Sequence, residues 1–388
     1  MLFQNEKSRA RLSAILEQPT APFREGRVIA AIETILKKEK ISYFLDPAKN
    51  IVVGVKSKAE YLKLIRVKST EPVRLFIAHM DHPGFHGVEW LDDERLTFEW
   101  HGGSPTAHLL GGKVWLADEE GFVGEGRVEE AELLPSGRAI KSGIIRVKDL
   151  RRQVKAKEIS GGFGFRKTHW SEGDLLYTKC ADDLIGVFAI VETAIALKKK
   201  KSPFIGLLTR AEEVGFIGTL AHLELGWFKS AKRPLLCVSL ETSRTLPGAD
   251  IGKGPVVRLG DKKNIFHSGA TTVFSELAAK VLPGKHQRRI MDGGTCEGSA
   301  ATSYDIPTIA ISVPLGNYHN QSFEGGPDAA ETNGPAPEFV SLSDIEGMCL
   351  LTQAVMKPKL PWATPYSGAI KEFKANLRKY ASLLKSAP

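Results

Sequence analysis

The sequence has few cysteines, and they are widely spaced. Its four cysteines, at positions 180, 237, 296 and 349, include no pair at the Cys-x-x-Cys spacing. This excludes a disulfide scaffold and a cysteine-based zinc knuckle, and it is typical of a reducing compartment. We therefore expect a cytoplasmic protein.

Long apolar runs are also absent. No stretch approaches the roughly 18–20 apolar residues that a membrane-spanning helix requires, and the first residues lack the pattern of a signal peptide. We expect no membrane among the partners. Hydrophobic residues still make up 42% of the 388 residues and charged residues 25%, which predicts a folded chain of two to three units with a sizeable core.

Acidic residues are scarce in one segment, residues 357–388. The net charge is +8, and seven basic residues against one acid place +6 of it there. A nucleic-acid-binding protein would spread its basic residues over the fold, so we expect no nucleic acid among the partners. Residues 357–365 form a proline-rich linker.

Beyond this linker the spacing of apolar residues predicts a basic amphipathic helix. We expect it to pack on the domain surface, with contact to a membrane surface or a partner as the alternative. The apolar positions, which recur every three or four residues, are Ile370, Phe373, Leu377, Tyr380 and Leu384.

Helical and strand patterns alternate over most of the remaining chain. Residues 23–40 and 184–201 have helical spacing, whereas 73–79 and 203–209 are short apolar runs typical of buried strands. This alternation predicts an α/β fold with a parallel or mixed sheet and helices on both faces.

Residues 86–170 differ from this pattern. Short apolar runs separated by Gly, Asp-Glu and Pro-Ser predict a small all-β domain, which we interpret as an insertion into a discontinuous α/β domain. The predicted units are residues 1–85 and 171–356 for the α/β domain, 86–170 for the inserted β domain, and 357–388 for the linker and basic helix.

Five polar clusters lie at the ends of predicted strands or before predicted helices. In open α/β sheets ligands bind at the carboxyl edge of the strands, where these clusters are expected. Taken singly, each has an ordinary explanation, such as a helix N-cap or a solvated turn. The clusters are His79 with Asp81, Asp182 with Asp183, Glu212 with Glu213, Glu241 alone and His319 alone.

Together these clusters indicate a metal centre. Histidines and carboxylates from separate strand ends are ligands that zinc, cobalt and manganese accept. A bridging carboxylate with two further ligands for each ion gives a two-metal site, which lowers the pKa of a water and polarises a carbonyl. Glu212, beside another carboxylate, is the candidate general base.

The order of the motifs AHMD, CADDLIG, TRAEEVGFIG, IGKGP and GGT resembles the cocatalytic zinc exopeptidases. Within that group the sequence is most similar to the glutamyl/tetrahedral aminopeptidase family, over about residues 20–355. The resemblance implies a zinc-exopeptidase-like fold with a β-barrel inserted after the first histidine motif. It also implies two metal ions, held by His79, Glu241 and the bridging Asp182 on one side, and by Glu213, His319 and the same Asp182 on the other.

Further roles follow from the same resemblance. Glu212 would be the general base that activates a metal-bridged water, and Asp81 would orient His79. The peptide between Asp182 and Asp183 is often cis in such proteins. From its position beside the first histidine motif, rather than from the resemblance, His82 is expected to be a loop residue or one that supports the ligand residues.

The sequence departs from the family pattern at three places. Leu184 stands where an arginine is usual, and Glu241 stands where an aspartate is usual. The motif GGTDA reads GGTCEG, so Cys296 replaces an aspartate and Glu297 follows it. We expect Cys296 to be a core thiol, with a soft group near the metal as the alternative, and Glu297 to compensate in part at the substrate site.

These features predict a dinuclear metal-dependent aminopeptidase that hydrolyses peptides. We expect two divalent metal ions per chain, with zinc as the first choice and cobalt or manganese as alternatives. The resemblance implies a homo-oligomer formed through the β insertion.

Two alternatives stay open. The first is a metal-dependent N-acyl amino-acid deacylase or carboxypeptidase, which would need a cationic group for a substrate carboxylate, such as Arg288 or Arg289. The second is a catalytically inactive member.

Overall fold

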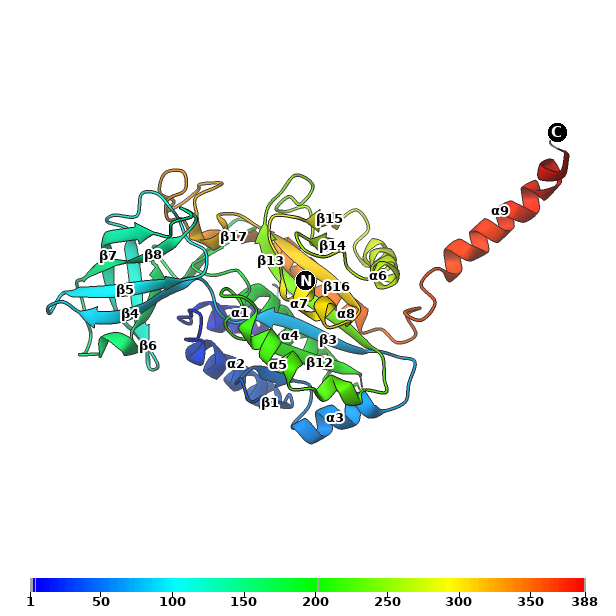
Figure 1. Ribbon diagram of the computed structural model, residues 1–388, viewed down its shortest axis with the longest axis horizontal. Helices are drawn as coiled ribbons and strands as arrows, with labels where there is room; N and C mark the ends of the chain where they lie inside the picture. Colours follow the sequence, from blue (N-terminus) through cyan, green and yellow to red (C-terminus); the bar gives the residue numbers. More distant parts are fainter. Residues whose placement is uncertain (1–2, 4, 201, 387–388) are drawn as a thin grey trace.

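The molecule has a large α/β body, a β-barrel beside it and a last helix that stands apart (Figure 1). The computed structural model describes residues 3, 5–200 and 202–386. The outermost residues of the predicted first and last units, and residue 201 at the end of a predicted helix, therefore lie outside the described residues.

The α/β body is built on an eight-stranded mixed sheet with the strand order β1-β2-β12-β3-β13-β16-β14-β15. Strands β12, β3, β13 and β16 are parallel neighbours, and β2 and β14 run antiparallel to them. The fold class predicted from the sequence is confirmed. The strands are β1 (Tyr43–Leu45), β2 (Ile51–Val53), β3 (Val73–His79), β12 (Phe204–Thr209), β13 (Leu235–Arg244), β14 (Val256–Asp261), β15 (Gln287–Met291) and β16 (Thr308–Leu315).

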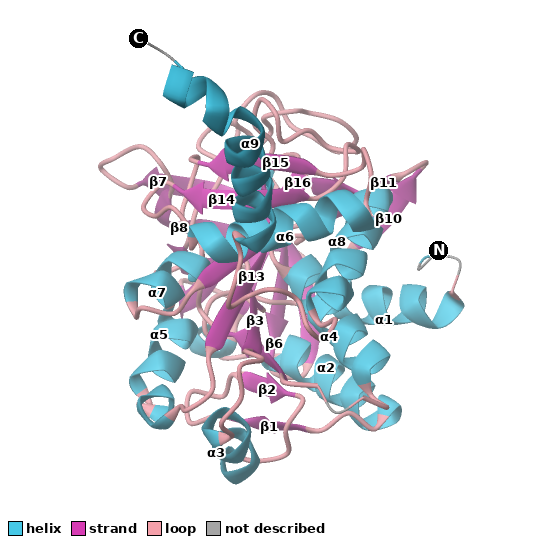
Figure 2. Ribbon diagram, turned by 90° about the vertical axis from the view of Figure 1, so that its right-hand side faces the viewer, coloured by secondary structure: helices cyan, strands magenta, loops and turns pink. Residues whose placement is uncertain are grey.

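Helices cover both faces of this sheet (Figure 2). Every residue of β3, β12 and β16 is buried, as expected for strands covered on both sides. One face carries α1 (Glu6–Leu16), α2 (Gly26–Glu39), α4 (Leu184–Leu197), α6 (Ser268–Val281) and α8 (Leu342–Val355), and the other carries α3 (Lys58–Arg66), α5 (Ile217–Glu224), α7 (Glu297–Ser303) and the one-turn helix η3 (Trp227–Ser230).

The barrel is closed by six strands in the order β4-β5-β8-β7-β6-β9 and has its own apolar core. Its strands lie between residues 84 and 163, while the domain boundaries at 85/86 and 170/171 stay predictions. The strands are β4 (Gly84–Trp90), β5 (Arg95–His101), β6 (Lys113–Asp118), β7 (Gly121–Leu133), β8 (Ile140–Val147) and β9 (Ser160–Phe163), with the one-turn helix η2 (Ala156–Glu158) before β9.

A small third sheet lies beside the strand ends of the main sheet. It has the order β10-β11-β17, formed by β10 (His169–Glu172), β11 (Leu175–Thr178) and β17 (Glu338–Ser341). The one-turn helix η4 (Tyr318–Asn320) follows β16. This sheet therefore brings residue 338 close to segments that precede it by many residues in the sequence.

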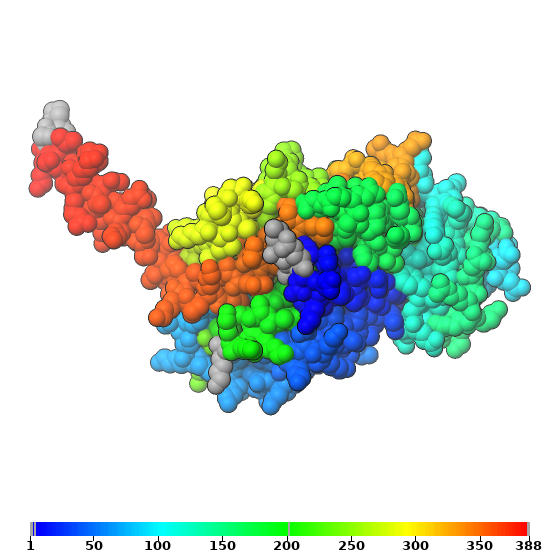
Figure 3. Space-filling view, turned by 180° about the vertical axis from the view of Figure 1, so that it is seen from behind, coloured from blue at the N-terminus to red at the C-terminus, as the bar shows by residue number. Residues whose placement is uncertain are grey.

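The last helix, α9 (Ser367–Ser386), extends away from the body (Figures 1 and 3). The expectation that it packs on the domain surface is wrong, because the large apolar side chains of its predicted stripe are 48–72% exposed. The proline-containing linker carries the chain away from α8 before the helix begins. No helix among the described residues is both long and apolar enough to cross a membrane.

Candidate metal centre and active site

The predicted site residues meet at one edge of the main sheet. His79 is the last residue of β3, Glu213 follows β12, and Glu241 lies near the end of β13. His319 lies in η4 after β16, and Asp182 lies directly before the N-cap of α4. Because β12, β3, β13 and β16 are parallel neighbours, their carboxyl ends lie together.

Asp182 faces a histidine with each of its two carboxylate oxygens. Oδ1 is 3.5 Å from His79 Nε2, and Oδ2 is 3.8 Å from His319 Nε2. Ligand atoms of His79, Asp182 and Glu241 lie within 4.8 Å of one another, and so do those of Asp182, Glu213 and His319. Asp182 thus belongs to both clusters, as a bridging ligand would.

Several buried atoms of these clusters lack a hydrogen-bond partner. They are Asp182 Oδ1, Glu213 Oε1 and Glu241 Oε1, whereas His319 Nε2 lies 3.1 Å from Glu213 Oε2. Buried polar atoms are normally paired, and unpaired charge in the interior is costly. Oxygen and imidazole nitrogen are donors that zinc, cobalt and manganese accept, so the residues present fit divalent metal ions.

Asp81 orients His79 through its backbone and holds the glutamate pair through its side chain. The carbonyl of Asp81 accepts a hydrogen bond from His79 Nδ1 at 3.1 Å, which leaves Nε2 directed at Asp182. The carboxylate accepts the backbone N–H groups of Glu212 at 2.9 Å and of Glu213 at 3.2 Å. The side-chain role was not anticipated from the sequence.

Glu212 is a buried carboxyl next to the two clusters. Its Oε2 lies 3.9 Å from His79 Nε2. Burial raises the pKa of Glu212 well above its usual range; His79 opposes the shift, while Glu213 and Glu241 add to it. A carboxyl with a raised pKa can take up a proton and return it near neutral pH.

The peptide between Asp182 and Asp183 is cis, as the resemblance implies. Asp183 Oδ1 caps α4 by accepting the N–H of Gly186 at 3.1 Å, and it also accepts the hydroxyl of Thr242 at 2.8 Å. The N-cap explanation therefore holds for Asp183, which leaves Asp182 directed at the histidines.

Glu338 supports two candidate ligands and was not anticipated from the sequence. This fully buried carboxylate accepts the backbone N–H of Ala181 at 2.6 Å and of Asp182 at 3.2 Å through Oε2. Its Oε1 accepts the N–H of His319 at 2.9 Å. No periodic signal in the sequence marks Glu338, because only the third sheet brings β17 to this place.

His82 contacts the backbone of the candidate ligand Asp182, as expected. Its Nδ1 donates to the Asp182 carbonyl at 3.0 Å, and its Nε2 lies 3.1 Å from Asn320 Oδ1. The Asn320 amide nitrogen donates to the Lys179 carbonyl, which assigns the amide oxygen to the His82 side. Both ring nitrogens of His82 therefore donate, and the ring ties the Asp182 loop to η4.

The segment that carries His319 has an unusual backbone. Asn317, His319 and Asn320 have φ angles of 55°, 56° and 58°, a conformation that non-glycine residues adopt rarely and at a cost. The barrel also approaches closely here, since a Cβ at Gly103 would lie 2.0 Å from His319 Nδ1. The position of this histidine thus depends on both domains.

The three departures from the family pattern have separate explanations. Leu184 is a fully buried core residue at the start of α4. Cys296 is a buried thiol that lies 3.5 Å from Asp261 Oδ2, so the core interpretation holds. Glu297 accepts hydrogen bonds from the Thr209 and Thr219 hydroxyls and does not line the substrate cavity, which contradicts its expected role.

A cavity of about 280 Å³ opens onto the metal candidates Asp182, Glu241 and His319. The arginines predicted for the cleft, Arg288 and Arg289, lie on the edge strand β15 and do not line it. Three other arginines do, and sequence reasoning missed them because they come from distant segments. They are Arg138 from the turn between β7 and β8 of the barrel, Arg244 at the end of β13 and Arg258 in β14.

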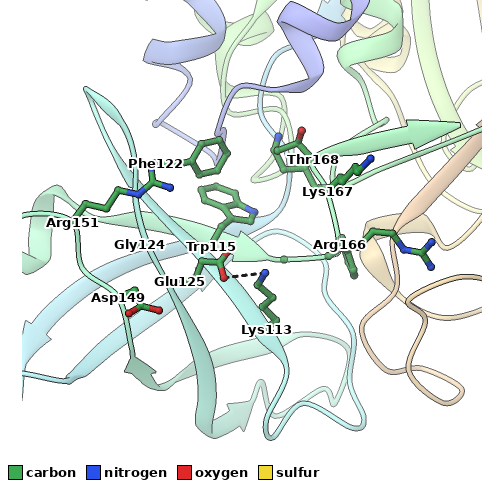
Figure 4. Close-up of a pocket in the computed structure, with 13 residues that line it drawn as sticks. Lys113, Trp115, Phe122, Gly124, Glu125, Asp149, Arg151, Arg166, Lys167 and Thr168 are labelled. Carbon is green, nitrogen blue, oxygen red and sulfur yellow. Dashed lines mark ion pairs between the residues drawn. The ribbon is translucent and has the colours of Figure 1, made fainter.

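A second cavity, of about 470 Å³, lies on the barrel next to the segment that leads to β10 (Figure 4). Trp115 and Phe122 meet there edge to face, and Lys113 pairs with Glu125 at 2.9 Å. None of the metal candidates lines this cavity. It is therefore separate from the candidate active site.

Comparisons with known proteins agree with this geometry. A curated protein of Acetivibrio thermocellus whose name places it among the aminopeptidases is 26% identical over 66% of this chain and 79% of its own length. The TET aminopeptidase of a marine Thaumarchaeota archaeon has a similar fold, with a TM-score of 0.71, 19% identity and coverage of 93% and 100% of the two chains.

The TET1 peptidase of Pyrococcus horikoshii is similar as well, with a TM-score of 0.69, 21% identity and coverage of 90% and 99%. The model of the M42 glutamyl aminopeptidase family matches residues 63–324, which include every candidate metal ligand named above. The chain belongs to the M42 glutamyl aminopeptidase family.

Proposed function

We propose that this peptidase removes N-terminal residues from peptides at a dinuclear metal centre. The observation that carries the proposal is the arrangement of Asp182, whose two oxygens face the His79 and the His319 clusters. Glu241 completes the first cluster and Glu213 the second. The M42 family match supports the same reaction.

When bound, divalent metal ions lower the pKa of a water and polarise the scissile carbonyl. Glu212 accepts a proton from the attacking water at its carboxylate and passes it to the amine nitrogen. The water oxygen bonds to the carbonyl carbon, and the peptide C–N bond breaks. The Asp81 carboxylate keeps Glu212 in place by accepting the backbone N–H of Glu212.

The arginines of the cavity indicate a substrate that carries a carboxylate near the scissile bond. Arg258 is buried and its Nε has no hydrogen-bond partner, while Arg244 lies over the Phe323 ring at 3.6 Å. Guanidinium groups bind carboxylates well. An acidic N-terminal residue suits this cavity, and so does the substrate of a deacylase or carboxypeptidase, which is therefore the second candidate function.

One peptide offered in three forms separates these functions. A peptide that begins with glutamate is supplied free, N-acetylated and C-amidated, with zinc, cobalt or manganese, and products are followed by mass spectrometry. Stepwise loss from the free N-terminus, absent from the acetylated form, supports the aminopeptidase. Loss of the acetyl group or of C-terminal residues supports the second candidate, and no cleavage with any metal indicates an inactive member.

The general-base role predicts the behaviour of Glu212→Gln. This variant should bind metal normally but lose turnover by about 10²–10⁴-fold, because an amide cannot take up the proton. Metal content and kcat are measured on the same sample. Glu276→Gln, an exposed change of the same chemistry on α6, should leave both unchanged, and an undiminished kcat in Glu212→Gln would refute the mechanism.

We also infer that copies of the chain assemble through the barrel. The TET1 peptidase of Pyrococcus horikoshii can form a tetrahedron or a large octahedral shell. The barrel has a self-contained core and projects from the α/β body (Figure 3). It is thus accessible to a second copy of the chain.

A further inference from the structure

Helix α9 presents an apolar stripe that is largely exposed among the described residues. Exposure is 49% for Ile370, 65% for Phe373, 58% for Leu377, 48% for Tyr380 and 72% for Leu384. These side chains recur every three or four residues, so on a helix they form one continuous face. Figure 3 shows the helix projecting beyond the body, with this segment exposed over most of its length.

The basic residues of α9 are placed along one flank of that stripe. On a helix of 3.6 residues per turn, Lys371, Lys374, Arg378 and Lys385 project on the side next to the apolar face. The remaining cation, Lys379, lies 4.9 Å from the centre of the Tyr380 ring. The helix has a single acid, Glu372, so its net charge is +4.

The linker keeps this helix separate from the catalytic part of the molecule. The Tyr366 hydroxyl donates to Ser268 Oγ at 3.0 Å just before α9 begins. Within the helix, Arg378 Nε donates to the Lys374 carbonyl of the same helix. The stripe is thus free to lie on a broad surface without hindrance from the sheet or the barrel.

The positive charge and the apolar stripe of α9 together indicate the class of partner that this helix binds. A nucleic acid would neutralise the cations but would leave the aromatic and aliphatic side chains exposed. A second copy of α9 could cover the stripe, but it would bring a net charge of +4 beside another +4. A lipid layer with anionic headgroups matches both the apolar stripe and the positive charge. Its acyl chains bury the stripe, and its headgroups pair with the lysines and the arginine.

We propose that α9 is a membrane-surface helix that inserts its apolar stripe into the interface of an anionic lipid layer. The aromatic rings and leucines lie among the upper acyl chains, and the flanking cations lie at headgroup level. The helix lies in the plane of the layer and does not span it. The proposal concerns attachment of the molecule to a surface, and it does not depend on the proposed peptidase function.

Co-sedimentation of the full-length protein with lipid vesicles tests the proposal. Vesicles of phosphatidylcholine with about 30% phosphatidylglycerol should bind the protein at low salt, and about 0.5 M salt should release most of it. Pure phosphatidylcholine vesicles should bind at least about tenfold less protein, because they lack the attraction for the cations.

Two sets of variants separate the apolar and the electrostatic contributions. Phe373→Ser combined with Leu377→Ser should lower the partition coefficient by at least about tenfold, because two large side chains no longer enter the layer. Replacing Lys371, Lys374 and Arg378 by glutamine should lower it by up to about a hundredfold on anionic vesicles. Ala375→Ser, on the polar face, is the matched control and should bind as the original protein does.

All variants should keep peptidase activity, since α9 lies outside the candidate active site. Equal sedimentation with anionic and neutral vesicles, or unchanged binding by the double serine variant, overturns the proposal. The proposal is also overturned if, in the absence of lipid, the double serine variant forms a smaller oligomer than the original protein. That result would show that the stripe contacts a second copy of the chain. The proposal is also overturned if the protein does not bind vesicles but binds RNA, and the double serine variant binds RNA equally well. That result would assign the cations to nucleic acid.

Discussion

Glu338 contacts the candidate metal centre through hydrogen bonds to two backbone segments. It accepts N–H groups from the Asp182 segment with one oxygen and from His319 with the other. These two residues belong to the same candidate cluster, and Asp182 also belongs to the second one. Glu338 is thus a positioning residue that fixes the distance between a bridging ligand and a histidine.

The variant Glu338→Gln should therefore bind zinc about 10–100-fold more weakly. Glutamine replaces one of the two accepting oxygens by an NH₂ group, which faces an N–H donor and pushes one ligand segment away. We expect kcat to fall more than KM changes. Zinc affinity is measured by competition with a chelator, and kcat and KM are measured at saturating zinc.

Unfolding of the metal-free variant is the control for this prediction. A residue with a purely structural role would lower the metal-free stability while the folded fraction kept its zinc affinity. That outcome would contradict the positioning role. Glu276→Gln, exposed on α6, should leave stability, zinc affinity and kcat unchanged.

The candidate ligands could be predicted from the sequence because each lies at or shortly after the end of an apolar strand, or before an apolar helix. His79 after VRLFIA and Glu212–Glu213 after FIGLLT are examples. Glu338 and Arg138 could not, because a short strand and a turn carry them, and only tertiary contacts bring them to the site. The Asp81 carboxylate also departs from expectation because it bonds to backbone N–H groups, which a sequence pattern does not reveal.

Strand β4 attaches the barrel to the segment before α2 through a histidine. His86 Nε2 donates to the Pro22 carbonyl at 2.8 Å, and its ring lies 4.3 Å from that of His101. Burial lowers the pKa of His86 from 6.5 to about 4, although the Pro22 carbonyl opposes the shift. The neutral ring is therefore part of the junction between barrel and body.

This junction should lose stability in acid. The folded pKa of His86 is depressed, so the unfolded chain binds more protons between pH 6.5 and about 4. The contribution of His86 is complete above pH 6.5 and falls by about 2 kcal/mol as pH drops through this window, with allowance for partial exposure of the ring. Urea unfolding at pH 4, 5, 6 and 7 measures the change.

The variant His86→Gln isolates the effect, because its amide can donate to the Pro22 carbonyl but does not titrate. It should lose about 2 kcal/mol less than the original protein between pH 7 and pH 4. Identical pH dependence in the two proteins would show that the loss arises elsewhere. Unfolding should be followed by a tryptophan signal from the barrel, which contains Trp100 and Trp115.

Some elements were predictable and others were not, for physical reasons. The regions of α2 and α4 were both predicted as helices, α2 from the helical spacing of its apolar residues and α4 from its strongly apolar sequence. Helix α8 was not, because most of its residues are buried and no single polar stripe marks its period. The region of α9 was recognised as a helix from its stripe, but its separation from the body depends on the linker and was predicted incorrectly.

The candidate metal centre connects parts of the molecule that are far apart in sequence. Candidate ligands come from β3, β13, the loop after β12, the segment before α4, and η4. Without cations, buried carboxylates at this place repel one another, which raises the pKa of Glu212 and Glu241 in addition to the effect of burial. The stability of the α/β body should therefore depend on bound metal.

Removal of metal by a chelator should lower the midpoint of thermal unfolding by about 5 °C or more, and added zinc should restore it in a concentration-dependent way. Circular dichroism follows the transition. A variant with His79→Ala and His319→Ala should show little response to the chelator or to zinc. If neither the chelator nor zinc changes the midpoint of thermal unfolding of the original protein, the result would contradict a metal centre at this sheet edge.

The closed barrel stands in the chain between His79 and Asp182, and Glu338 comes after His319. During translation, a ribosome therefore releases the first candidate ligand long before the last groups that complete the site. A nascent chain that has not passed residue 338 lacks the carboxylate that holds both Asp182 and His319. The full set of groups that hold the candidate site is therefore present only when synthesis of the α/β body is nearly finished.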